Sequence, residues 1–196
     1  AQDTRFNVLP AERTGLKFVN SIVETEALNV LSYEYFFNGG GTAVGDINND
    51  GLPDLFFTAN MGDNKLFLNQ GNRKFKDITQ QASPMLKGRT GGWKTGVAMA
   101  DVNGDGWLDI YVCYSGKGED DQRRNQLFIN NKNATFTEAA AAFGLDDKSF
   151  STQAAFFDFD NDGDLDLFLL NHSNKKIDNM ELARYRKDVD ELAGSK

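Results

Sequence analysis

The chain has 196 residues, of which 40% are hydrophobic and 12% aromatic, so its composition excludes a disordered chain and favours a globular one with a buried core. Its formal charge of -8 comes from 29 acidic and 21 basic residues. Because nucleic-acid binding depends on clustered Lys and Arg, nucleic acid is not an expected partner. No segment approaches the roughly 20 apolar residues that span a bilayer, so we expect no transmembrane segment.

The first 38 residues precede any repeat. Residues 6–9 (FNVL) and 15–20 (GLKFVN) predict two strands, which a polar connection joins to Phe36. We therefore assign 1–38 to N-terminal strands and a connection.

A repeat organises the rest of the chain. Residues 41–60, 96–115 and 153–172 align with one another, and their acidic loops begin at Asp46, Asp101 and Asp158. A second element follows in 65–79 and again in 126–140, where two apolar runs flank turns rich in Asn and Gly. Each repeat therefore predicts four short antiparallel strands, and such a unit at this spacing is typical of a β-propeller blade.

The predicted fold is all-β, a partial propeller of about three four-stranded blades. The repeats are assigned to 39–95, 96–152 and a truncated 153–196. Within the last repeat, the apolar residues of 177–193 share one helical face, which predicts a short helical insertion.

The first and second strands of the repeats are nearly all small or apolar, as in Ala43–Gly45 and Val97–Ala100. They lack the alternation of a half-solvated strand, so we expect neighbouring blades to cover both faces. Glycines such as Gly41 and Gly96 would allow close backbone approach there.

The three acidic loops share the pattern D-x-[DN]-x-D-G-x-x-D. Calcium binds six to eight oxygen atoms, and this pattern offers side-chain oxygens at positions 1, 3, 5 and 9, a carbonyl at position 7 and a turn-forming glycine at position 6. The predicted ligands are Asp46, Asn48, Asp50, Leu52 and Asp54 in the first loop, Asp101, Asn103, Asp105, Trp107 and Asp109 in the second, and Asp158, Asp160, Asp162, Asp164 and Asp166 in the third.

Other interpretations of these loops fit less well. An EF-hand needs a bidentate Glu at position 12, where this chain has Phe57, Val112 and Leu169. Magnesium prefers a tighter octahedron with retained waters, and the loops contain no His or Cys for zinc or copper. Asp-Asn-Gly turns without metal are the plain alternative, which three loops in register disfavour. We expect about three structural Ca²⁺ ions.

The motif GDINNDGLPDLFF resembles the FG-GAP/VCBS repeat of integrin α propellers. The resemblance covers residues 39–171 of the chain. Longer segments of the chain, including GGWKTGVAMADVNGDG, resemble surface proteins of Bacteroidetes-type bacteria that combine such repeats with an ASPIC/UnbV domain. The resemblance implies an extracytoplasmic protein, either secreted or a lipoprotein of the bacterial outer membrane. Closed propellers of this family usually have seven blades, so closure is not expected from three.

The sequence is consistent with three functional hypotheses. The first is a calcium-binding module for cell-surface adhesion that binds a glycan or protein ligand, with Trp93 and 116–124 as rim or merely solvated loop residues. The second is a calcium-dependent polysaccharide lyase or hydrolase. It is disfavoured because we expect His172, the single histidine, to lack a nearby serine- or cysteine-based constellation of nucleophile and base and to be structural. The third is a purely structural scaffold.

Two further expectations concern burial and assembly. Cys113 cannot form an internal disulfide because it is the single cysteine, and its apolar surroundings predict a small buried side chain. A partial propeller leaves strand edges open, and a homodimer would cover them.

Overall fold

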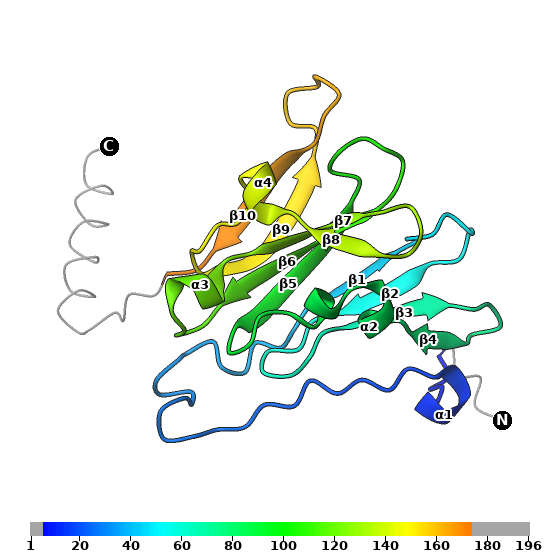
Figure 1. Cartoon of the computed structure of the whole chain (residues 1–196). Helices are drawn as coiled ribbons and strands as arrows, with labels where there is room; N and C mark the ends of the chain where they lie inside the picture. The colour runs from blue at the N-terminus through cyan, green and yellow to red at the C-terminus, as the bar shows by residue number, and fades with distance from the viewer. Residues whose placement is uncertain (1–5, 174–196) are drawn as a thin grey trace, which may run out of the picture.

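The computed structural model describes residues 6–173. These residues form three antiparallel sheets that follow one another along the chain and lie side by side (Figure 1). The first sheet contains β1 (Thr42–Gly45), β2 (Asp54–Phe57), β3 (Lys65–Asn69) and β4 (Phe75–Asp77). The second contains β5 (Trp93–Ala100), β6 (Asp109–Ser115), β7 (Gln126–Asn130) and β8 (Phe136–Glu138), and the third contains β9 (Ser151–Phe157) and β10 (Asp166–Asn171).

The strand order confirms the predicted four-stranded unit in the first two repeats. Each sheet is an antiparallel meander in sequence order, β1-β2-β3-β4 and β5-β6-β7-β8. The β3–β4 turn is closed by the Gln70 N–H, which donates to the Lys74 carbonyl at 2.8 Å, and Gly71 and Asn72 adopt positive φ. β5 begins at Trp93, three residues before the predicted start of the second repeat.

Short helices connect the sheets. A single helical turn follows the fourth strand of both complete sheets, as α2 (Thr79–Ala82) and α4 (Ala140–Phe143). The 3₁₀ helix η1 (Pro84–Lys87) follows α2, and α3 (Asp120–Arg123) lies between β6 and β7. No helix in 6–173 is long and apolar enough to cross a membrane.

The N-terminal segment differs from its prediction. Residues 6–9 and 15–20 form no strand, and α1 (Ala11–Thr14) lies between them. Pro10 precedes this helical turn, and Gly15 ends it with a left-handed φ of 82°. The segment contacts the first sheet through side chains rather than a backbone ladder, since Phe18 stacks on Phe57 with ring centroids 5.0 Å apart. An apolar run can therefore pack on a sheet without joining it.

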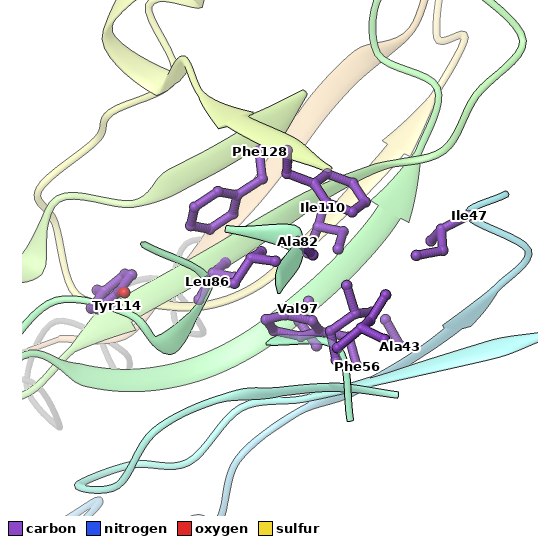
Figure 2. Packing of buried hydrophobic residues seen from close by; sticks show 13 residues of the cluster. Ala43, Ile47, Phe56, Ala82, Leu86, Val97, Ile110, Tyr114 and Phe128 are labelled. Atoms are coloured by element: carbon purple, nitrogen blue, oxygen red, sulfur yellow. The ribbon is translucent and has the colours of Figure 1, made fainter. Parts of the chain in front are cut away.

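The core lies between neighbouring sheets. Figure 2 shows Phe56 and Ala43 of the first sheet facing Val97, Ile110 and Phe128 of the second. Along β6, alternate residues belong to different clusters: Ile110, Val112 and Tyr114 pack toward the first sheet, whereas Tyr111 and Cys113 pack toward the third.

The middle sheet confirms the expectation of coverage on both faces, because all seven residues of β6 are buried. In the outer sheets the expectation was wrong, because each has one face that no neighbouring sheet of the described chain covers. On β1, Val44 is 61% exposed, and on β10, Phe168 is 59% exposed. Cys113 is fully buried, as predicted, and burial raises the pKa of its thiol to about 12.

Two glycines lie where first strands of adjacent sheets approach closely. A Cβ on Gly41 would stand 2.8 Å from the Val97 nitrogen, and the Gly41 N–H donates to the Thr95 carbonyl at 2.9 Å. A Cβ on Gly96 would stand 2.4 Å from the Thr152 carbonyl oxygen of the next sheet. The predicted close approach is therefore confirmed at both positions.

Candidate metal sites

The three acidic loops occupy equivalent positions in the fold. They connect β1 to β2, β5 to β6 and β9 to β10, and all three emerge at the same end of the molecule (Figure 1). The sheets repeat, so the loops form a row along this end.

The first residue of each loop organises the turn that follows. In the first loop, the Asp46 carboxylate accepts the Gly51 N–H at 2.7 Å and the Asp50 N–H at 3.2 Å. In the second, Asp101 accepts the corresponding N–H groups of Gly106 and Asp105 at 2.7 and 2.9 Å. The third loop has the same two bonds, from Gly163 and Asp162 to Asp158, at 3.1 and 3.2 Å.

The fifth residue of each loop accepts from the seventh. The N–H groups of Leu52, Trp107 and Asp164 donate to Asp50, Asp105 and Asp162 at 2.8, 3.0 and 3.1 Å. A coordinating role for the seventh carbonyl stays a prediction.

Positive φ occurs at two positions of every loop. The glycine at position 6 is Gly51, Gly106 or Gly163, with φ of 84°, 86° and 97°. Position 4 also has positive φ, and sequence reasoning did not single it out. Its residues are Asn49, Gly104 and Asn161, which are among the types that tolerate this conformation. The recurrence of Asn or Gly at position 4 of the three loops is the sequence feature that could have predicted this conformation.

The ninth residue lies at the start of the second strand and points back into the loop. Asp54 is fully buried and accepts the Ile47 N–H at 3.0 Å and the Asn69 N–H at 2.7 Å. Asp109 is likewise buried and accepts from Val102 at 3.0 Å and from Asn130 at 2.8 Å.

Burial raises the pKa of both carboxyls, that of Asp109 to about 6, and the neighbouring loop aspartates raise them further. Neither carboxylate is paired with a Lys or Arg in the part of the chain that the structure describes. A buried anion without a counter-charge favours a bound cation.

The third loop brings its carboxylates closest together. Oxygens of Asp158, Asp160 and Asp166 all lie within 4.8 Å of one another. The pKa of Asp164 is raised chiefly by the charge of Asp162, which adds to the same crowding. In the first two loops, Asn48 and Asn103 replace one carboxylate, and their amides donate to Asp50 and Asp105 at 3.0 and 3.2 Å.

The donor set fits a hard divalent cation. The loop side chains at positions 1, 3, 5 and 9 offer oxygen atoms, and in the described residues the one ion pair to a predicted ligand is Lys132 to Asp105 at 3.4 Å. Calcium accepts this many carboxylate and amide oxygens at flexible angles. The predicted side-chain ligands of each loop therefore lie within one short turn, and their role as calcium ligands stays a prediction.

A comparison with known protein families identifies the repeat. The sequence model of the FG-GAP-like repeat matches residues 46–112 and 113–169, which is more than half of the chain. The chain belongs to the FG-GAP-like repeat family.

Curated relatives of this FG-GAP-like chain include cartilage acidic protein 1 from Xenopus tropicalis, which is 32% identical over 155 residues, 76% of this chain and 22% of the relative. The protein of the same name from Mus musculus is 34% identical over 136 residues, 68% of this chain and 20% of the relative. This chain thus spans about a fifth of the length of these relatives.

In this FG-GAP-like chain, an asparagine at the end of the third strand of each four-stranded sheet donates hydrogen bonds to carbonyls of the acidic loops. The sequence alone placed this asparagine only in a turn. The Asn130 amide donates to the Leu108 carbonyl of its own loop at 3.1 Å and to the Ile47 carbonyl of the preceding loop at 2.8 Å. Its counterpart Asn69 donates to the Pro53 carbonyl at 2.8 Å. The sequence feature that could have revealed this role is the recurrence of the asparagine in LFLN and LFIN.

The expectation that His172 has no serine nearby was wrong. Its Nε2 lies 2.7 Å from Ser115 Oγ, and the Tyr33 hydroxyl lies 3.0 Å from the same Ser115 oxygen. The His172 Nδ1 lies 2.9 Å from the Ser173 carbonyl, so Nδ1 donates and Nε2 accepts from Ser115. Ser115 is 1% exposed, which keeps substrate from its hydroxyl, and we interpret the group as packing.

Trp93 differs from its prediction as a solvated loop residue, and its alternative as a binding residue stays a prediction. It begins β5, is buried, and packs against Tyr33 and Phe36 with ring centroids 5.5 and 5.3 Å away. The two glycines before it, Gly91 and Gly92, are typical of a loop, but long-range aromatic contacts decide the burial of Trp93. Residues 116–124 contain α3, whose capping box joins Glu119 and Gln122. The predicted helical insertion 177–193 lies outside the described residues.

Proposed function

We propose that this chain is a calcium-binding part of an extracytoplasmic β-propeller and that each of its three acidic loops binds one Ca²⁺. The observation that carries the proposal is the repetition of one hydrogen-bonding pattern in three loops made of oxygen donors. The buried carboxylates of Asp54 and Asp109, without a basic partner in 6–173, support it.

The ions would have a structural role. A cation between positions 1, 3, 5 and 9 joins the end of one strand to the start of the next, and its charge offsets the repulsion among the loop carboxylates. The loop supplies most of the ligands, which leaves little coordination for a substrate.

The test is metal analysis of the purified chain together with thermal unfolding in calcium and in EGTA. We expect about three bound ions. Each site at about a hundredfold excess of calcium over its Kd adds about 2.7 kcal/mol, or roughly 5–10 °C in Tm for a chain of this size.

Asp101→Asn and Asp158→Asn should each reduce the count by one ion. Asp63→Asn is the matched control, because Asp63 lies outside the loops and is exposed, with Lys87 3.7 Å away. An unchanged Tm in EGTA and no bound calcium would refute the proposal and leave the loops as turns.

The family supports a proposal for the wider role. We propose a module of an extracytoplasmic protein, secreted or anchored at a bacterial surface, which acts in adhesion by binding a glycan or protein. The alternatives are a calcium-dependent polysaccharide-active enzyme and a scaffold that binds calcium alone. A homodimer through the open sheet edges stays a prediction, which sedimentation velocity of the calcium-loaded chain tests.

A further inference from the structure

We propose that a pocket at the end opposite the acidic loops binds a neutral sugar ring of a glycan. The proposal rests on the binding role proposed above and names the ligand class and the site. The pocket has a volume of about 200 Å³.

The pocket lies where the three sheets meet. Its lining includes Gly41 just before β1, Thr95 and Gly96 at the start of β5, and Thr152 and Gln153 at the start of β9. Each of these strands runs from the pocket toward its acidic loop, so pocket and loops lie at opposite ends (Figure 1). Residues 33–41 complete the lining and bring aromatic side chains to it.

Aromatic rings and amides share this lining. Tyr33, Tyr35 and Trp93 contribute rings. Tyr33 and Trp93 are each 6% exposed and lie edge-to-face at 5.5 Å, and Tyr35 packs on His172 with ring centroids 3.9 Å apart. Asn38 and Gln153 are exposed and contribute amides. The ring atoms that line the pocket form an apolar floor against which the C–H groups of a sugar can pack, and the amides can both donate to and accept from its hydroxyls.

Several polar groups here have no hydrogen-bond partner among residues 6–173. They are the side-chain amides of Asn38 and Gln153 and the indole N–H of Trp93. The amides therefore stay available to a ligand without breaking an existing bond. Fixed rings with free amides resemble the general pattern of small-molecule sites, mostly apolar surface with few polar groups.

The lining contains no Lys, Arg, Asp, Glu or His. A charged ligand would lose its hydration on entering the pocket and find no opposite charge there. A sialylated or sulfated sugar and a basic peptide are therefore both disfavoured. The volume is below the roughly 300–1,000 Å³ of pockets for drug-sized ligands. One ring of a larger glycan therefore fits better than an extended peptide.

The experiment applies the calcium-loaded chain to an array of neutral, sialylated and sulfated glycans. Saturation-transfer NMR then follows methyl glycosides of galactose, glucose, mannose and N-acetylglucosamine. We expect neutral glycans to bind. Gln153→Ala and Asn38→Ala should each weaken binding about tenfold, as expected for one or two lost hydrogen bonds. Gln81→Ala is the matched control, an exposed glutamine in α2, and should leave binding unchanged.

Four results would overturn the proposal: no neutral glycan bound, selective binding of acidic glycans, equal binding by all three variants, or peptide binding that Gln153→Ala abolishes. The calcium count and Tm, measured on the same samples, separate these failures from failure of the calcium proposal. A chain with three ions and no glycan binding refutes the sugar site alone.

Discussion

At the scale of single residues, the glycines of the first strands determine how closely the sheets approach. Gly96 lies against the backbone of Thr152 in the neighbouring sheet, and no rotamer change relieves a clash with backbone atoms. By contrast, a Cβ on Gly62 would meet only the Ala59 Cβ at 3.5 Å, an ordinary contact.

We therefore expect Gly96→Ala to lower the free energy of unfolding by about 1–3 kcal/mol, because its Cβ forces the second and third sheets apart. Urea unfolding measures the change. Gly62→Ala is the control and should leave stability unchanged or raise it slightly, since alanine restricts the unfolded chain. Equal effects of the two substitutions would show that sheet spacing is not limited at Gly96.

At the scale of elements, the third strand of each complete sheet stabilises the acidic loop of that sheet. The backbone N–H groups of Asn69 and Asn130 donate to Asp54 and Asp109. The side chains differ, because Asn130 also reaches the Ile47 carbonyl of the preceding loop and is buried.

Asn130→Ala should therefore destabilise the chain by about 2–3 kcal/mol, since it leaves the buried Ile47 carbonyl and the part-buried Leu108 carbonyl without this donor. Asn69→Ala, the matched substitution, removes the exposed bond to the Pro53 carbonyl and the bond from the Gly71 N–H, whose counterpart at Asn130 comes from Lys132, and should cost about 0.5–1 kcal/mol. Urea unfolding of both variants in EGTA keeps calcium out of the comparison. If Asn69→Ala cost as much as Asn130→Ala, the bond between loops would contribute nothing.

At the scale of the whole molecule, the middle sheet is the part that both neighbours cover. All residues of β6 are buried, whereas β10 has no buried residue and pairs with β9 alone in the described part of the chain. Local stability should follow this order, because exposed backbone bonds open with little loss of packing.

Hydrogen exchange followed by mass spectrometry tests that order. We expect the amides of β6 to exchange about a hundredfold or more slowly than those of β10, with β2 between them. Peptides from one digest serve as internal controls for one another. Equal protection of β6 and β10 would mean that the three sheets unfold as one unit.

The sequence alone determined the repeat, the four-stranded unit and the candidate ligand positions of the loops, because these follow from local spacing and residue chemistry. Asp46 meets Gly51 and Asp101 meets Gly106 within a single turn of chain. The oxygen-only donor set follows from the same few residues. They also carry the resemblance to the FG-GAP-like repeat family.

Only the tertiary structure decided features that depend on distant contacts. Ser115 and Tyr33 are 82 residues apart, and Ser115 and His172 are 57 apart, yet their side chains meet. The burial of Trp93 and the packing of Phe18 on Phe57 likewise depend on neighbours from other segments. Hydrophobicity and glycine content mark a residue as able to be buried or to turn, but which surface covers it depends on how the sheets pack.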